Sequence, residues 1–305
     1  MSSGAAAVVL RDVTLRDGLQ DEVPLATATK VALCEAIVAA GVTELEVGSF
    51  VRADRVPAMA DTEALCAATA SVPAVRWGLV LNERGAERAL EAGIRHLQYV
   101  VSVSDTHSRH NAGASTDDAM AGLDRVAALA AETSVALELT LATAFGCPYE
   151  HEVPPGRVAE LAARASGLGV ASVSLADTIG VAVPTEVAAL IAAVEASTSV
   201  RLGVHLHDTR GLGVANALAA VAAGVTRIDG SVGALGGCPF APGATGNVAL
   251  EDLVYALELM GVSTGVSLDG LIAAAALACA AVGRPVGSHL GIAGPRFRPR
   301  DHPDG

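Results

Sequence analysis

The chain has 305 residues, 51% of them hydrophobic, a formal net charge of −13 and a pI near 5.0. This length and hydrophobic content allow one large α/β barrel or two ordinary domains. The acidic balance argues against nucleic acid or an anionic membrane as a partner, because both require a positively charged surface.

Eight short apolar segments recur along the chain, each followed by an alanine-rich helical segment. Four of these helical segments end at glycine before the next strand, in AIVAAGVTELEV, ALEAGIRHLQYV, RASGLGVASVSL and ALAAVAAGVTRIDG. Such repetition predicts an α/β fold, a (β/α)8 TIM barrel rather than an open doubly wound sheet. The expected strands are Val9–Leu15, Glu44–Gly48, Arg76–Val80, His96–Val103, Val135–Ala142, Ser172–Asp177, Arg201–Asp208 and Arg227–Val232.

We expect one domain over residues 1–305, with the barrel at about 8–262 and a C-terminal helix and tail at about 263–305. The most apolar stretch, 271–283, is shorter than the roughly 18 residues of a spanning helix and predicts a buried terminal helix. The N-terminus lacks a basic and apolar leader, which favours a cytoplasmic protein. Five cysteines without a CxxC pair indicate neither a disulfide framework nor a zinc ribbon.

Polar residues follow the expected strands at their carboxyl ends, where barrels of this kind form their active face. Each residue alone has a structural explanation: Arg16 could be a surface ion pair, and Asp177 could cap the next helix. Several strand ends would nevertheless have to place these groups on one face by chance. The candidates are Arg16, Asp17 and Gln20 after strand one, Glu46 and Ser49 on and after strand two, and Asp177 and Thr178 after strand six.

His205 and His207 are two residues apart on the seventh strand, so both imidazoles project from the same face and could bind one metal ion. A structural His pair is the alternative. Asp17 and the amide oxygen of Asn247 could complete a set of N and O ligands, which suits Mg²⁺ or Mn²⁺. Cys238, in the glycine-rich segment LGGCPFAPGATGNVALED, would then be free for chemistry, although most lone buried cysteines are inert.

The chain resembles the 3-hydroxy-3-methylglutaryl-CoA lyases, within the DRE-TIM metallolyase superfamily. The resemblance implies that Asp17, His205, His207 and Asn247 bind the divalent cation. It also implies that Arg16, Glu46, Asp177 and Cys238 line the reaction centre, that Arg284 approaches CoA and that the protein is a homodimer. We assign Arg16, Gln20, Ser49, Thr178 and Arg284 to substrate binding. The resemblance is carried by LRDGLQDE, ELEVGSFV, VPAMAD, GCPYE, SLADTIGV, HLHDTRG and the Cys238 segment.

The implied reaction is a retro-Claisen cleavage of an acyl-CoA substrate to acetyl-CoA and acetoacetate. Asp17 or His205 would remove the hydroxyl proton, Arg16 would stabilise the enolate, and Cys238 would protonate its carbon. Closure of the glycine-rich loop over substrate would exclude water during this step.

Three departures from the family pattern lie near the substrate. Thr140 stands where the family has tyrosine, and Glu138 stands where a basic residue can occur. The segment Ser104–Gly113 adds His107, Arg109 and His110, which would meet CoA phosphates or form a solvated loop. The alternatives are therefore a lyase for (R)-citramalyl-CoA or a longer-branched thioester, a Claisen condensing enzyme, and a non-catalytic acyl-CoA-binding protein.

Overall fold

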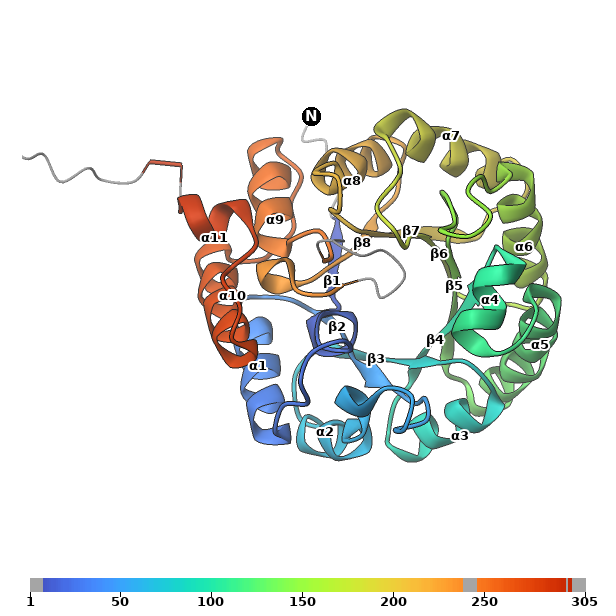
Figure 1. Ribbon diagram of the computed structural model, residues 1–305, viewed down its shortest axis with the longest axis horizontal. Helices are drawn as coiled ribbons and strands as arrows, with labels where there is room; N and C mark the ends of the chain where they lie inside the picture. Colours follow the sequence, from blue (N-terminus) through green and yellow to red (C-terminus); the bar gives the residue numbers. More distant parts are fainter. Residues whose placement is uncertain (1–7, 238–245, 295, 298–305) are drawn as a thin grey trace, which may run out of the picture.

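Eight parallel strands pair in chain order, and β1 also pairs with β8, so the sheet closes into a barrel (Figure 1). The computed structural model describes residues 8–237, 246–294 and 296–297. The predicted (β/α)8 fold is confirmed, and each expected strand is present. The strands are β1 (Val9–Asp12), β2 (Glu44–Ser49), β3 (Val75–Val80), β4 (His96–Ser102), β5 (Ala136–Ala142), β6 (Ser172–Asp177), β7 (Arg201–Leu206) and β8 (Arg227–Gly230).

Helices surround the barrel and cover the outer face of the sheet (Figure 1). Gly41 and Gly224 follow two of them with φ of +100° and +98°, a conformation that glycine adopts without steric cost. The helices are α1 (Thr27–Ala39), α2 (Thr62–Ala68), α3 (Glu83–Glu91), α4 (Asp105–Ala112), α5 (Thr116–Thr133), α6 (Pro155–Gly167), α7 (Pro184–Glu195), α8 (Gly213–Ala222), α9 (Leu250–Leu259), α10 (Leu268–Val282) and α11 (His289–Ala293), with short turns η1 (Thr14–Gly18), η2 (Pro57–Met59) and η3 (Val232–Ala234).

Strand residues alternate between an apolar layer under the helices and a polar barrel interior. On β5, Leu137, Leu139 and Leu141 belong to the hydrophobic core, while Glu138 and Thr140 lie between them in the sequence and are also buried. Successive side chains of a strand point to opposite faces, so these two polar residues face the interior. The barrel therefore encloses charged groups that must pair with one another.

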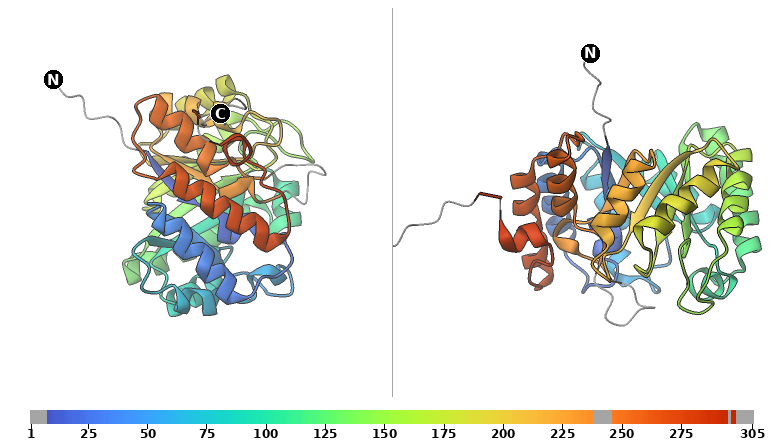
Figure 2. Two further views of the ribbon diagram at one scale, coloured as in Figure 1. Left: turned by 90° about the vertical axis from the view of Figure 1, so that its left-hand side faces the viewer. Right: turned by 90° about the horizontal axis from the view of Figure 1, so that it is seen from above.

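The predicted terminal helix is α10, which lies against α1 and α9 on one side of the barrel (Figure 2). Leu271, Ala275 and Cys279 are buried on its inner face, whereas Leu277 is 44% exposed. The predicted terminal helix is therefore buried on one face and exposed on the other, and the short helix α11 follows it. Among the described residues, no helix combines the length and the hydropathy needed to cross a membrane.

The first strand ends three residues earlier than expected, at Asp12 instead of Leu15. The carboxylate of Asp12 accepts hydrogen bonds from the Thr14 backbone N–H (3.0 Å) and the Thr14 hydroxyl (2.6 Å), which turns the chain out of the sheet. Residues 14–18 then form the π-helical turn η1, closed by Gly18 N–H donating to the Val13 carbonyl at 3.0 Å.

Candidate metal centre and active site

The turn η1 places Arg16 and Asp17 at the carboxyl end of β1, where both side chains are buried. Wide turns of this kind are rare in helices and occur often at functional sites. Because of this turn, the consecutive side chains of Arg16 and Asp17 both lie at the barrel mouth. In a continuous strand they would point to opposite faces of the sheet.

Three of the predicted metal ligands meet above β1 and β7. Asp17 Oδ2 lies 3.4 Å from His207 Nε2 and 3.9 Å from His205 Nε2, and the two Nε2 atoms are 3.2 Å apart. His207 lies just beyond β7 and not within it, but its extended pairing with Asn247 keeps both imidazoles on the same side. All three side chains are buried, and each offers one ligand atom within 4.8 Å of the others.

Asn247 supplies the fourth group of the donor set. Its Nδ2 donates to Asp17 Oδ2 at 2.7 Å and to the Leu235 carbonyl at 3.0 Å. Its Oδ1 is buried and has no hydrogen-bond partner among the described residues. A buried unpartnered amide oxygen beside a carboxylate and two imidazoles fits a divalent cation with mixed N and O ligands, so these residues suit Mg²⁺ or Mn²⁺.

The charge of Asp17 is strongly favoured at this position. Burial by itself would raise the pKa of Asp17, but Arg16, the hydrogen bond from His207 and the proximity of His205 hold it well below its usual range. Asp17 therefore remains ionised at neutral pH, as a metal ligand must be.

Arg16 is held by two carboxylates. Its Nε donates to Glu46 Oε2 at 2.5 Å, and its Nη1 donates to Asp17 Oδ1. Arg16 is 8% exposed and Glu46 is fully buried, so the pair is not the surface ion pair that the sequence alone allowed. No hydrogen bond from Nη2 is seen within the described part of the chain, which leaves donor capacity for an oxygen in the site.

The remaining predicted residues are spread around the same end of the barrel. Gln20 Nε2 donates to Asp17 Oδ1 at 3.1 Å. The carboxylate of Asp177 accepts from the backbone N–H groups of Val181 (2.9 Å) and Ala182 (3.0 Å), so it shapes the loop after β6. Burial raises the pKa of Asp177, although these hydrogen bonds and the nearby His207 oppose the shift.

Two other candidates occupy strand ends. The hydroxyl of Thr178 accepts from the Thr143 backbone N–H at 2.8 Å and so joins two loops, while Ser49 is buried at the end of β2. Arg284 follows α10 and pairs with Glu22 at 3.0 Å. Cys238 lies outside the described residues.

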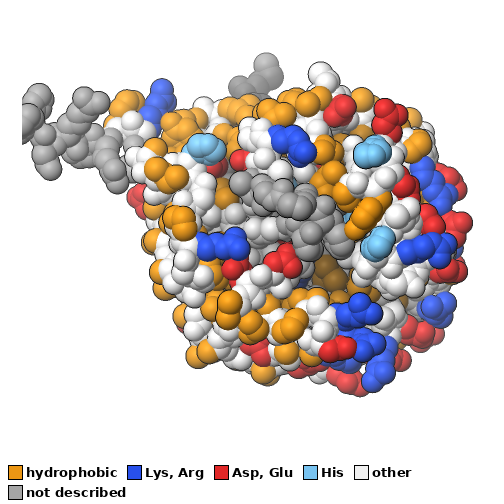
Figure 3. All heavy atoms as spheres, in the orientation of Figure 1, with side chains coloured by type: hydrophobic (Ala, Val, Ile, Leu, Met, Phe, Trp, Pro, Cys, Tyr) orange, Lys and Arg blue, Asp and Glu red, His pale blue; other side chains and the backbone are white. Residues whose placement is uncertain are grey.

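A cavity of about 480 Å³ opens beside the metal-ligand cluster. Figure 3 shows this face of the molecule, with many charged side chains along the rim over α3, α5 and α6. The cavity walls are mostly glycine and other small residues, and Arg284 and His289 supply the basic groups. Its lining consists of Asp208, Thr209, Gly211, Gly233, Ala234, Leu235, Gly236, Gly246, Arg284, Pro285, Gly287 and His289.

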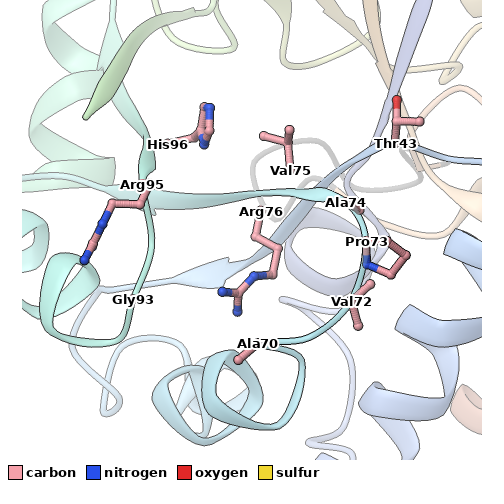
Figure 4. A pocket seen from close by; sticks show the side chains of 10 residues that line it. All are labelled: Thr43, Ala70, Val72, Pro73, Ala74, Val75, Arg76, Gly93, Arg95 and His96. Atoms are coloured by element: carbon pink, nitrogen blue, oxygen red, sulfur yellow. The ribbon is translucent and has the colours of Figure 1, made fainter. Parts of the chain in front are cut away.

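A second hollow of about 540 Å³ lies at the opposite end of the barrel, near the start of β3 and β4. Its basic side chains, Arg76, Arg95 and His96, point in different directions (Figure 4). Arg76 donates to the Cys66 carbonyl at 2.7 Å, and Arg95 donates to the Ile94 carbonyl at 2.9 Å. Because no polar groups converge there, this hollow is not the candidate site.

Two expectations about the acyl pocket are corrected. The segment Ser104–Gly113 is largely the helix α4 and not a loop, because Ser104 caps it by accepting from His107 N–H at 3.1 Å. His107 is buried, and Arg109 pairs with Asp105 at 2.8 Å. Glu138 does not face an acyl pocket: it is fully buried in the barrel interior and paired with arginines there.

Glu251 was not among the residues predicted from the sequence, and it supports the loop after β8. Its Oε1 accepts from Gly233 N–H at 2.9 Å, in the turn that leads toward the Cys238 segment. Burial raises its pKa to about 7. Burial also raises the pKa of Asp12 to about 7, and the negative charge of Glu251 adds to this shift. The only sequence signal was an acidic residue at the start of an apolar helix, which usually indicates a favourable helix dipole.

The raised pKa of Glu251 predicts a pH-dependent stability. Between the ordinary glutamate pKa of 4.5 and about 7, the folded protein holds a proton that the unfolded chain has lost, so the free energy of unfolding falls as pH rises. One such group contributes at most about 3 kcal/mol. Glu251→Gln keeps the acceptor for Gly233, and we expect its unfolding midpoint, measured at pH 5, 6, 7 and 8, to fall less than that of the wild type. Glu258→Gln, an exposed carboxyl of α9, is the control, and a Glu251→Gln variant with the wild-type slope would contradict the prediction.

Comparisons with known proteins agree over nearly the whole chain. A family model described as HMGL-like matches residues 7–278. The chain is 41% identical to (R)-citramalyl-CoA lyase from Chloroflexus aurantiacus, over 95% of this chain and 96% of that protein. It is 38% identical to a hydroxymethylglutaryl-CoA lyase from Bacillus subtilis, over 92% of this chain and 95% of that protein.

A solved structure extends the similarity to three dimensions. An HMG-CoA lyase from A. baumannii, in complex with coenzyme A and 3-methylmalate, matches with a TM-score of 0.93 at 35% identity. The match covers 99% of this chain and all of that one.

Proposed function

The chain belongs to the HMGL-like family and is an enzyme of the lyase class, and from this premise we propose that it is a divalent-metal-dependent lyase that cleaves 3-hydroxy-3-methylglutaryl-CoA to acetyl-CoA and acetoacetate. The observation that carries the proposal is the convergence of Asp17, His205 and His207 next to Arg16 at the barrel mouth. A non-catalytic protein has no need for such a donor set.

Asp17, His205, His207 and Asn247 would hold the cation. When bound, the ion supplies Lewis acidity to the substrate hydroxyl and carboxylate oxygens. Asp17 accepts the hydroxyl proton as the carbon–carbon bond breaks, because a His205 that offers Nε2 to the ion and carries a proton on Nδ1 has no lone pair left for it. The electron pair of the broken bond goes to the α-carbon of the thioester. Arg16 donates hydrogen bonds to the enolate oxygen, and the thiol of Cys238 gives its proton to the α-carbon, which completes acetyl-CoA.

The cavity beside Arg284 offers a route for the CoA part of the substrate. The cavity borders the loop after β8, and its wall includes residues 235–236. Asn247 donates a hydrogen bond to the carbonyl of Leu235, so the cavity lies next to the metal-ligand cluster. We assign Arg284 to the CoA phosphates, because a guanidinium pairs well with phosphate oxygens. The structure of the A. baumannii relative contains coenzyme A, which supports an acyl-CoA substrate for this family member.

A second substrate has specific support. (R)-Citramalyl-CoA carries its carboxylate one methylene closer to the tertiary alcohol, and the relative from Chloroflexus aurantiacus acts on it by name. Thr140 gives the strand-five position a small polar side chain in place of tyrosine, and its hydroxyl lies 2.9 Å from the Gln98 amide oxygen when the amide nitrogen of Gln98 faces Glu46. Loss of one methylene from a substrate is worth only about 1–3 kcal/mol in a pocket, so one exchanged side chain is enough to shift preference.

The deciding experiment is turnover of the purified protein against the two thioesters side by side, following acetyl-CoA with Mg²⁺ or Mn²⁺ and with EDTA. EDTA-sensitive cleavage of hydroxymethylglutaryl-CoA supports the proposal. Preference for citramalyl-CoA selects the second substrate, and cleavage of neither by the metal-loaded protein contradicts both.

Cys238→Ala separates a lyase from a condensing enzyme or an acyl-CoA binder. We expect its turnover to fall about 100-fold or more, because a positioned acid contributes on this scale. Mn²⁺ binding should persist, since a thiol is not part of the N and O donor set. Cys34→Ala is the control, as Cys34 is buried in the helix layer away from the strand ends. A Cys238→Ala variant with wild-type turnover would contradict the assigned role.

A further inference from the structure

Arg11 lies on β1 in the barrel interior, fully buried beneath the candidate metal centre. Its guanidinium binds both oxygens of Asp229 on β8, with Nε 2.9 Å from Oδ1 and Nη2 2.6 Å from Oδ2. Nη2 also lies 2.9 Å from Glu138 Oε1 on β5. A planar guanidinium with two simultaneous contacts to one carboxylate fixes the orientation of that carboxylate.

Asp229 connects Arg11 to the metal-ligand cluster. Its Oδ2 lies 3.4 Å from Nδ1 of His205, and the two residues are neighbours in the β7–β8 pairing. This is an electrostatic contact and not a hydrogen bond of good geometry, but a carboxylate this close to Nδ1 favours a proton on that nitrogen, which leaves the lone pair of Nε2 for an ion. The orientation of His205 therefore depends on Asp229, which depends in turn on Arg11.

A second connection runs from Arg11 to Arg16. With its amide nitrogen facing Glu46, Gln98 donates to Glu46 Oε1 and accepts from Arg11 Nη2 at 3.0 Å. The other oxygen of Glu46 accepts from Arg16 Nε at 2.5 Å. Gln98 and Glu46 are both fully buried, so neither has water as an alternative partner.

Arg227 is a further arginine of this interior cluster, and it does not reach the site. It pairs with Glu138 and contacts the Ser172 hydroxyl at 3.2 Å, on the opposite side of Glu138 from Arg11. Arg11 and Arg227 lie 5.0 Å and 5.5 Å from the centre of the Trp77 ring. Arg11 and Arg227 thus share a carboxylate and an aromatic ring and differ in their connection to the metal centre.

We propose that Arg11 is a positioning residue for the active site, which orients His205 through Asp229 and Arg16 through Gln98 and Glu46. The inference rests on the proposed metal-dependent function. It adds residues inside the barrel that orient the site from below. Three arginines and three carboxylates pair with one another there: Arg11, Arg16, Arg227, Glu46, Glu138 and Asp229.

Two charge-balanced double variants test the His205 connection. Arg11→Met with Glu138→Gln and Arg227→Met with Glu138→Gln each remove one arginine and the same carboxylate, so the number of unpaired buried charges is matched. We expect the first to weaken Mn²⁺ binding 10–100-fold, measured by calorimetry without substrate, as disturbed supporting residues do. The second should stay within about twofold of the wild type, because its arginine does not contact Asp229. Equal effects of the two double variants, or unchanged or tighter binding in the first, would overturn the proposal.

Single variants keep the proposal testable if the first double variant does not fold. Asp229→Asn replaces one of the two carboxylate oxygens by an NH₂ group. The remaining oxygen cannot serve Arg11 at two positions and also face His205, so Mn²⁺ binding should weaken by at least about tenfold. Gln98→Met preserves size and breaks the connection from Arg11 to Glu46, while the contacts of Arg11 with Asp229 remain, so kcat should fall while Mn²⁺ affinity is retained. Unchanged Mn²⁺ affinity in Asp229→Asn would refute the connection to His205. Unchanged kcat in Gln98→Met would refute the connection to Arg16. Because metal affinity is measured without substrate, a wild type that binds Mn²⁺ but cleaves neither thioester would refute the proposed function and leave this inference standing.

Discussion

Replacement of His207 by alanine is expected to abolish tight binding of Mn²⁺ and to lower turnover at least about 1,000-fold. His207 Nε2 lies 3.2 Å from His205 Nε2 and 3.4 Å from Asp17 Oδ2, so its removal takes one of the four proposed ligands from the centre of the cluster. The imidazole is buried, and it belongs to the one group of three potential metal-ligating side chains found among the described residues. Calorimetric titration with Mn²⁺ and acetyl-CoA release are the measurements.

The control for this variant is His96→Ala. His96 is a half-buried histidine at the opposite end of the barrel, in contact with the Trp77 ring at 5.1 Å. It should bind Mn²⁺ as the wild type does, with turnover nearly unchanged. Retention of wild-type Mn²⁺ affinity by His207→Ala would show that the cluster is a structural histidine pair, which was the alternative at the level of sequence.

The strands and the barrel were predictable because each depends on local pattern. Alternation such as Leu137, Glu138, Leu139 identifies a strand without reference to any partner, and glycine after a helix identifies its end. The end of β1 was not predictable in this way. The hydrogen bonds from Thr14 to the Asp12 carboxylate compete with the pairing of the sheet at a point that the residue pattern does not mark. The helix α4 was missed because its residues are mostly polar and lack a helical apolar stripe.

The candidate site was predictable to the extent that barrel topology brings strand ends together. Asp17 and His205 are far apart in sequence, yet the common direction of parallel strands places both at one end. The residues beneath them were not predictable, since the partner of Arg11 is 218 positions away and is selected by the closure of β1 on β8. A charged residue inside a strand signals an interior partner but does not identify it.

We assign Arg16 to the stabilisation of the enolate and not to the binding of the cation, and its contacts explain how it does so. Glu46 fixes Nε and Asp17 fixes Nη1, so the guanidinium plane is set before any substrate arrives. A preorganised donor of this kind stabilises charge as it develops and needs no reorganisation during the reaction. Arg16→Lys keeps the positive charge but cannot hold both carboxylates while presenting a third donor in the same plane.

We therefore expect Arg16→Lys to lower kcat about 100- to 1,000-fold with little change in KM and with Mn²⁺ affinity largely retained. Arg88→Lys is the matched control, because Arg88 also pairs with a glutamate, Glu63, but lies on the outer helix α3. A variant with raised KM and wild-type kcat would assign Arg16 to substrate binding alone. Loss of Mn²⁺ affinity in parallel with kcat would instead mean that Arg16 acts by holding Asp17 in place, because the same guanidinium also lowers the pKa of that carboxylate. The split between kcat and metal affinity thus decides whether the arginine stabilises the enolate or only organises the cation site.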